Sequence, residues 1–167
     1  MTGAKLAVIG FLTIVLQVVV VSRIEVFGAR GDIVLLFAVA VGYEADADRG
    51  AVAGFSAGLV FDLLLSTPMG LSALTGCLVG WVVGTFQDAV LRTTWWIPVL
   101  GAALASAVGT VFYAALAKLF GVATVEIGAL PGIVVAVATI NALLSRPMRW
   151  AVRRAIGDQR RARVLLR

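Results

Sequence analysis

The sequence predicts an all-α membrane protein, folded as a bundle of six transmembrane helices. Mean hydropathy is +1.04, and 61% of the 167 residues are hydrophobic while only 14% are charged. Soluble domains carry about 25% charged residues. Apolar stretches long enough to cross a bilayer, about 18 residues or more, recur along the chain. The bilayer is therefore the expected solvent for most of the protein.

Short polar or Gly/Pro-containing stretches divide the chain into six apolar segments. The second is short, because its apolar part from Ile33 to Tyr43 rises only ~17 Å as a helix, whereas the hydrocarbon core is ~30 Å thick. It must borrow flanking residues or be shielded by neighbouring helices. The first segment is read as a retained helix, since it lacks a clear small-x-small cleavage site and further segments follow. The six segments cover approximately residues 5–22, 33–44, 50–66, 70–90, 95–119 and 129–147.

Basic residues are concentrated at the end of the chain. From residue 146 onward there are eight arginines and one acid, whereas residues 1–145 hold six Lys/Arg and eight Asp/Glu. With six spans and both termini in the cytoplasm, eleven basic residues lie inside and three outside, as the positive-inside rule requires. We expect anionic lipids, and not nucleic acid, to be the partner of this basic segment.

This charge pattern divides the chain into a transmembrane domain, 1–147, and a basic cytoplasmic tail, 148–167. A seven-residue recurrence of arginine indicates a basic amphipathic helix on the inner leaflet. A disordered charged tail is the alternative, because Gly157 and Asp158 interrupt the helical pattern. The arginines expected at the membrane surface are Arg146, Arg149, Arg153, Arg154, Arg160 and Arg161.

Glycines recur every four residues in two neighbouring segments, and each series ends in an aspartate. Residues 50–62 read GAVAGFSAGLVFD and residues 76–88 read GCLVGWVVGTFQD. Small residues at this spacing let membrane helices approach closely. The two stripes either face each other, since a short turn makes the segments antiparallel neighbours, or face another helix or a partner. The glycines assigned to helix packing are Gly50, Gly54, Gly58, Gly76, Gly80 and Gly84, with Gly101 and Gly109 in the fifth segment.

The two aspartates differ in their surroundings. Asp88 precedes Arg92 by four residues, which favours an interfacial ion pair. Asp62 has no basic residue within a helical turn, and a carboxylate well inside a span is costly and faces protein or a polar cavity. Three hypotheses remain open for Asp62: a hydrogen-bond acceptor for the following turn or another helix, part of a polar pocket or partner interface, or a proton or ion relay. Gln17 and Asn141 are the amides that could reach it.

Nothing in the sequence favours catalysis. There is no histidine and only one cysteine, Cys77, which excludes a His-based triad, a Cys/His metal site and an internal disulfide. Asp62 and Asp88 lie toward opposite ends of antiparallel helices, which argues against an aspartyl protease pair. No phosphate-binding loop of the G-x-x-x-x-G-K-[ST] form occurs. We expect no enzyme, no metal and no cofactor.

The segment GFSAGLVFDLLLSTPMGLSAL, residues 54–74, resembles the pattern of the MreD family of rod shape-determining membrane proteins. Gln17 and Asp32 also fit the family, although Gly31 stands where the family often has proline. The arginine-rich tail is longer than is usual for the family. The positions that carry the resemblance are Gly54, Gly58, Asp62, Pro68, Gly70, Ala73 and Leu74.

The resemblance implies a non-enzymatic subunit of the bacterial cell-elongation complex in the plasma membrane. MreD-like proteins act with MreC, MreB, RodA and a penicillin-binding transpeptidase in lateral peptidoglycan synthesis. The resemblance makes Gly54, Gly58, Asp62, Pro68 and Gly70 the candidate partner-binding or structural motif, with a single-span MreC-like protein as main partner. The family also resembles in fold the substrate-binding subunits of energy-coupling-factor vitamin transporters. Such a transporter subunit is the alternative, and it requires a polar, ligand-sized pocket.

Overall fold

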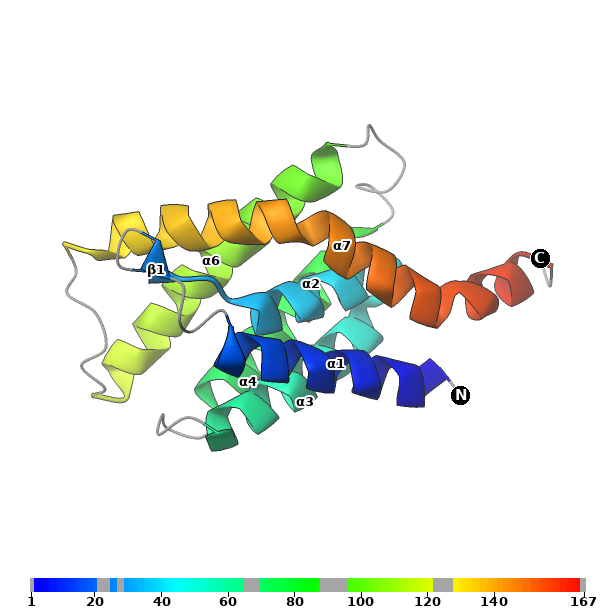
Figure 1. Ribbon diagram of the computed structural model, residues 1–167, viewed down its shortest axis with the longest axis horizontal. Helices are drawn as coiled ribbons and strands as arrows, with labels where there is room; N and C mark the ends of the chain where they lie inside the picture. The colour runs from blue at the N-terminus through cyan, green and yellow to red at the C-terminus, as the bar shows by residue number, and fades with distance from the viewer. Residues whose placement is uncertain are drawn as a thin grey trace.

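The computed structural model describes residues 2–20, 25–26, 29–64, 70–87, 96–121 and 128–165, with side chains for 3–20, 31–64, 70–87, 96–121 and 128–157 (Figure 1). In this part of the chain the backbone forms helices and one small hairpin. The hairpin pairs β1 (Glu25–Val26) with β2 (Ala29–Arg30) antiparallel. The helices are α1 (Thr2–Val19), α2 (Ile33–Glu44), α3 (Ala47–Leu64), α4 (Leu71–Thr85), α6 (Ile97–Leu119) and α7 (Leu130–Leu165).

Each predicted apolar segment overlaps one of these helices, so the helical fold class is confirmed. Within the described residues, two helices are long and apolar enough to cross a membrane by themselves, namely α6 and the part Leu130–Gly157 of α7. Three others are apolar but shorter: α1, α2 and α4. The 18-residue helix α3 carries three charged residues, Asp48, Arg49 and Asp62. Membrane crossing by length and composition is therefore supported for two helices.

Helix α2 occupies the middle of the bundle. All of its residues are buried, and it contacts each of the other five described helices. At 12 residues it is only ~18 Å long. Its neighbours shield it completely, which was one of the two solutions expected for so short a segment.

Hydrophobic clusters lie on two sides of α2. On one side Val34 and Phe37 pack with Ile14 of α1, Ala57 of α3 and Val152 of α7. On the other side α2 packs against α4 and α6, through a cluster of buried residues that consists of Leu35, Leu36, Val39, Tyr43, Val79, Val83 and Ala102. Both sides of the bundle are thus built on the same short helix.

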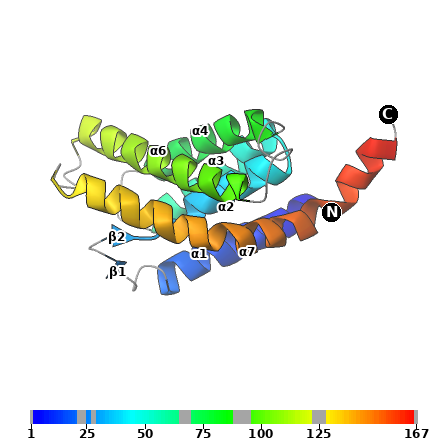
Figure 2. The same ribbon diagram turned by 90° about the horizontal axis from the view of Figure 1, so that it is seen from above.

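Helix α7 runs through the expected domain boundary without ending there. Pro147 lies inside it, where proline removes one backbone hydrogen bond and tends to kink the helix. Beyond this proline Val152 and Ile156 are still buried against the bundle. The last turns of α7 project past the bundle, and both termini lie at the same end of the molecule (Figures 1 and 2). The tail is therefore helical as far as Leu165.

Candidate functional site

The glycine stripes of α3 and α4 face each other. A Cβ on Gly54 would overlap the backbone of Gly76, and one on Gly50 would lie 2.5 Å from the carbonyl oxygen of Gly80. Residue numbers rise along α3 as they fall along α4, so the helices are antiparallel. Contact is backbone to backbone, which only residues without side chains permit.

The same interface continues at both of its ends. A Cβ on Gly58 would lie 2.5 Å from the carbonyl oxygen of Ser72, and one on Gly84 would overlap the backbone of Ala47. Of the glycines in α6, Gly101 lies against the hydroxyl of Tyr43, and Gly109 faces the side chain of Leu35. All eight glycines assigned to helix packing are thus in close contact, those of α6 with α2.

Asp62 holds the start of α4. Its carboxylate is 1% exposed and accepts hydrogen bonds from the backbone N–H groups of Gly70 at 2.9 Å, Ser72 at 3.0 Å and Ala73 at 3.3 Å. The first N–H groups of a helix have no partner within it and form the positive end of its dipole. Gly70, the residue before α4, has no side chain to cap them and adopts a left-handed backbone with φ 103°. Asp62 supplies the missing acceptor, as in the first of the three hypotheses.

Gln17 and Asn141 bind elsewhere, at the start of α2. The amide of Gln17 donates to the carbonyl of Gly31 at 2.8 Å and accepts from the N–H of Ile33 at 3.0 Å. Asn141 donates to the carbonyl of Asp32 at 2.8 Å and to Ser106 Oγ at 2.9 Å. These bonds tie α1, α6 and α7 to the first turn of α2.

Asp32 caps that same turn by accepting a hydrogen bond from the N–H of Leu35 at 2.9 Å. It takes the place that an N-cap residue normally has in a helix. Among the described residues that carry the resemblance, Gln17 and Asp32 thus serve the start of α2, whereas Asp62 and Gly70 lie at the start of α4.

The opposite end of α2 carries a charged cluster that the sequence did not reveal. Glu44 is 2% exposed, and its carboxylate accepts from Arg149 at 2.8 Å and from Arg153 at 3.2 Å. Arg149 also lies 5.7 Å from the centre of the Tyr43 ring, within the range of a cation–π contact. The pairs span 105 and 109 residues of sequence, so no local spacing could have indicated them.

The remaining predicted residues have different surroundings or lie outside the described part. Arg154 stacks on the exposed ring of Trp150 at 4.1 Å, and Arg146 is exposed. Arg160 and Arg161 lie on the projecting end of α7, and their membrane-surface role stays a prediction. Pro68, Asp88 and Arg92 lie outside the described residues.

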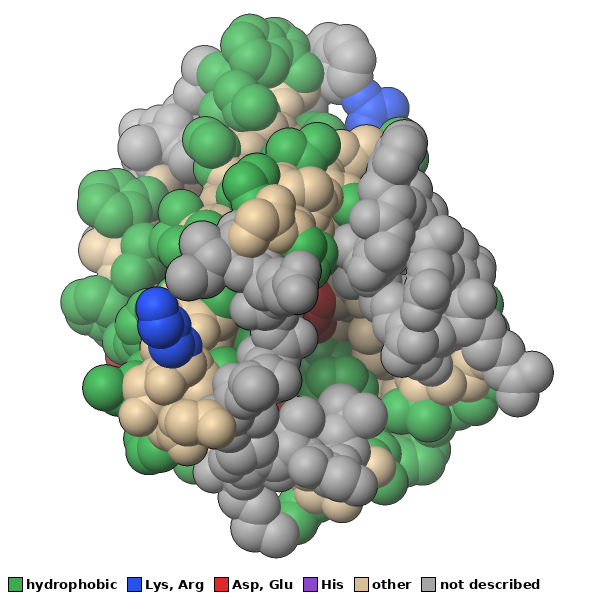
Figure 3. All heavy atoms as spheres, turned by 90° about the vertical axis from the view of Figure 1, so that its left-hand side faces the viewer, with side chains coloured by type: hydrophobic (Ala, Val, Ile, Leu, Met, Phe, Trp, Pro, Cys, Tyr) green, Lys and Arg blue, Asp and Glu red, His purple; other side chains and the backbone are tan. Residues whose placement is uncertain are grey.

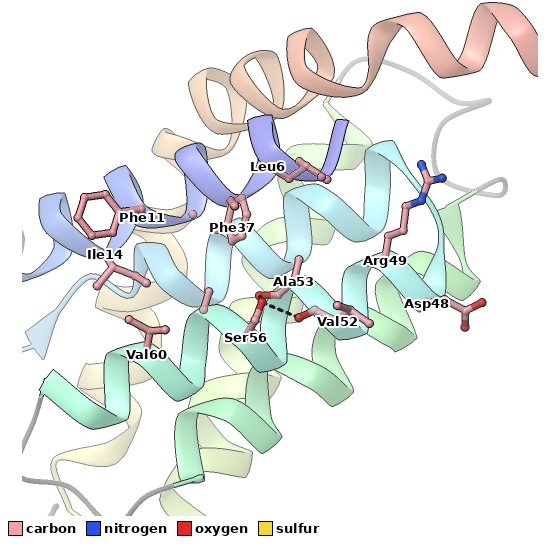
Figure 4. Close-up of a pocket in the computed structure, with 14 residues that line it drawn as sticks. Leu6, Phe11, Ile14, Phe37, Asp48, Arg49, Val52, Ala53, Ser56 and Val60 are labelled. Carbon is pink, nitrogen blue, oxygen red and sulfur yellow. Dashed lines mark hydrogen bonds between the residues drawn. The ribbon is translucent and has the colours of Figure 1, made fainter. Parts of the chain in front are cut away.

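Two large grooves lie between helices. One, of about 680 Å³, separates α1 from α3 above Phe37 of α2 (Figure 4). The other, of about 450 Å³, lies between α4 and α6 and is lined almost wholly by apolar side chains. A third cavity, beside Asp32 and Tyr113, is lined by both polar and apolar residues and has a volume of only about 20 Å³, enough for about one water.

Hydrophobic side chains cover much of the outside of the molecule. Phe11 is 65% exposed, Val108 65% and Leu143 74%. Figure 3 faces the end of the bundle opposite to the termini, where many hydrophobic side chains lie at the surface together with Lys or Arg side chains, and acidic atoms are visible in a recess. A soluble monomer rarely exposes so extensive an apolar surface, whereas lipid is a suitable solvent for it.

Comparison of the chain with known protein families, characterised proteins and solved structures finds no match. The resemblance to the MreD family therefore stays a prediction based on residues 54–74 and the positions named with them.

Proposed function

We propose that this protein is a multi-pass membrane scaffold of the MreD type, a non-enzymatic subunit that binds a single-span partner in the bacterial cell-elongation complex. The observation that carries the proposal is the nature of its concave surfaces. The two large ones are apolar grooves between helices. Such grooves suit an apolar helix, because small-molecule sites need convergent polar groups.

A six-span arrangement is part of the proposal. Both termini lie at one end of the bundle, as an even number of spans requires. Lys5 near the start of α1, Arg49 near the start of α3 and the arginines in the second half of α7 lie toward that side, which is cytoplasmic if the chain follows the positive-inside rule. The short helix α2 can remain at membrane depth because it is enclosed by protein.

The vitamin-transporter alternative requires a polar pocket of ligand size. The cavity beside Asp32 and Tyr113 holds only about 20 Å³. The groove of about 680 Å³ between α1 and α3 is of ligand size, but its charged lining residues, Asp48 and Arg49, lie at one end and do not converge on its centre. Ligand pockets have volumes of about 300–1,000 Å³. The small volume of the first cavity and the confinement of charge to one end of the groove support the scaffold proposal over the transporter alternative.

Co-purification tests the proposal. The tagged protein and the MreC-like single-span protein of the same cell are co-expressed and solubilised, and retention of the second protein is measured. Retention is expected, with RodA and the transpeptidase as further candidates for capture. Failure to retain the MreC-like protein, together with a bound vitamin detected by mass spectrometry, would establish the transporter reading instead.

Substitutions at Gly58 or Asp62 are unsuitable for this test. Both residues are buried at the contact between α3 and α4, so their variants report folding and not partner binding. Membrane topology is tested separately by labelling single cysteines in a Cys77→Ser background. Cysteines placed at Thr2 and Leu165 should react only from the cytoplasmic side.

A further inference from the structure

Small residues form part of both walls of the groove between α1 and α3, beside larger apolar side chains such as Leu6, Ile14 and Val60. Gly3, Ala7 and Gly10 line it from α1, and Ala53 and Ala57 line it from α3. They recur at helical spacing, so each wall is one face of its helix. The closed α3/α4 contact uses the same kind of residue to bring two helices together. Here no described helix fills the space between the walls.

The groove is elongated and its rim is apolar. Its wall on α1 extends from Gly3 to Ile14, a rise of ~17 Å. At the rim Phe11 is 65% exposed and Val52 69% exposed. A helix placed there would cover both side chains and meet small residues beneath them.

Polar groups that would recognise a small molecule are missing along this length. The hydroxyl of Ser56 donates to the carbonyls of Val52 at 2.8 Å and Ala53 at 3.2 Å, so it is satisfied within α3. The charged lining residues, Asp48 and Arg49, lie together at one end (Figure 4). The groove therefore offers an apolar surface with a charged end, which is the polarity of a transmembrane helix and its flank.

That end carries an available negative charge. Arg49 lies 3.6 Å from Asp46, whereas Asp48 is exposed and forms no ion pair with a described residue. The end is also the one at which both termini lie, the proposed cytoplasmic side. Cytoplasmic flanks of membrane spans are rich in Lys and Arg, so Asp48 is complementary to the flank of a partner helix.

We propose that the α1/α3 groove receives the transmembrane helix of the single-span partner, with the basic cytoplasmic flank of that helix against Asp48. This inference rests on the proposed scaffold function and adds the place and polarity of binding. The α4/α6 groove provides the matched comparison, because it is lined by Leu, Val, Phe, Ala and Tyr side chains and carries no charged residue.

Site-specific photo-crosslinking tests the position. A photoreactive phenylalanine analogue replaces Ser56 in one variant and Val108, in the α4/α6 groove, in the other; both positions are exposed. The MreC-like protein should cross-link from position 56 and not from position 108. Cross-links from 108 alone, to a second copy of this chain, or to lipid alone would overturn the groove assignment.

Substitutions that fill the groove or change the charge at its end test the same contact. Ser56→Trp should reduce retention of the partner at least about tenfold, a loss of ~1.4 kcal/mol, while Val108→Trp leaves it unchanged. Asp48→Lys should reduce retention more than Asp48→Asn, since only the first adds repulsion. Equal retention in all four variants would overturn the inference. If the wild-type protein retains no partner at all, the proposed function fails before the groove is in question.

Discussion

Helix α3 has small residues on two faces, of which one is packed against α4 and the other borders a groove. The face with Gly50, Gly54 and Gly58 is closed by α4, whose backbone leaves no space for a side chain. The face with Ala53 and Ala57 borders an open groove of about 680 Å³. Small residues at a spacing of three or four thus predict that a helix can approach, and they leave open whether that helix belongs to the same chain.

Substitution on the closed face should have the largest effect. Gly54→Leu places a side chain in the backbone of Gly76, where overpacking that cannot relax costs at least about 3 kcal/mol. The matched variant Ser56→Leu points to the open side and should fold normally. Thermal stability of the solubilised protein, followed by size-exclusion chromatography, measures both. Equal stability of the two variants would contradict the distinction between the faces.

The same contrast between enclosed and open contacts applies to the arginines of α7. The Arg149 side chain is 17% exposed and that of Arg153 is 64% exposed, while their shared partner Glu44 is 2% exposed. Breaking a buried pair costs about 3–5 kcal/mol, whereas exposed pairs contribute about 1 kcal/mol or less. Arg149→Ala should therefore lower the melting temperature much more than Arg153→Ala. A larger decrease in melting temperature for Arg153→Ala than for Arg149→Ala would contradict the greater contribution assigned to the Arg149 pair.

Asp62 and Asp48 of α3 also differ in that the first is buried and the second is exposed. Asp62→Asn keeps the shape but loses the charge that holds three N–H groups of the α4 start. Hydrogen bonds to charged groups contribute about 1.5–3 kcal/mol, so a destabilisation in this range is expected. Asp48→Asn, on the open side, should change stability by less than about 0.5 kcal/mol. The melting temperatures of the two variants measure this difference. An Asp62→Asn protein with unchanged stability would argue against the capping role.

Glycine-to-alanine changes should give the smallest effect and a change of sign. A Cβ on Gly157 meets no atom within 4 Å, so Gly157→Ala should stabilise α7 by about 0.5–1 kcal/mol through higher helix propensity. Gly76→Ala places its Cβ 2.7 Å from the carbonyl oxygen of Gly54 and should destabilise. If the melting temperatures of both variants moved in the same direction, the effect would not depend on the local contact at each glycine.

Much of this organisation could be predicted from the sequence. Each of the six apolar segments overlaps a described helix, although α7 continues well beyond its segment. The spacing of glycines in α3 and α4 indicated a close contact. The lack of a local basic residue singled out Asp62. The β1–β2 hairpin was not predicted, because strands of two residues have no readable periodicity.

Other features depend on distances that no local pattern encodes. Gln17 and Asn141 were candidates to reach Asp62, but they bind the start of α2. The reason is topological: α2 lies in the centre, and its first N–H and last C=O groups need partners from helices on all sides. The pairing of Glu44 with Arg149 follows from the same position.

The sequence by itself determined the apolar character of the chain, the approximate place of the described helices, and the spacing that lets α3 and α4 touch. These depend on composition and on the helical period, which are local properties. Only the tertiary structure decided that α2 is enclosed, that Asp62 caps α4 and that one small-residue face of α3 remains open. Those outcomes depend on which surfaces meet, and the same small residues permit either a closed contact or a groove.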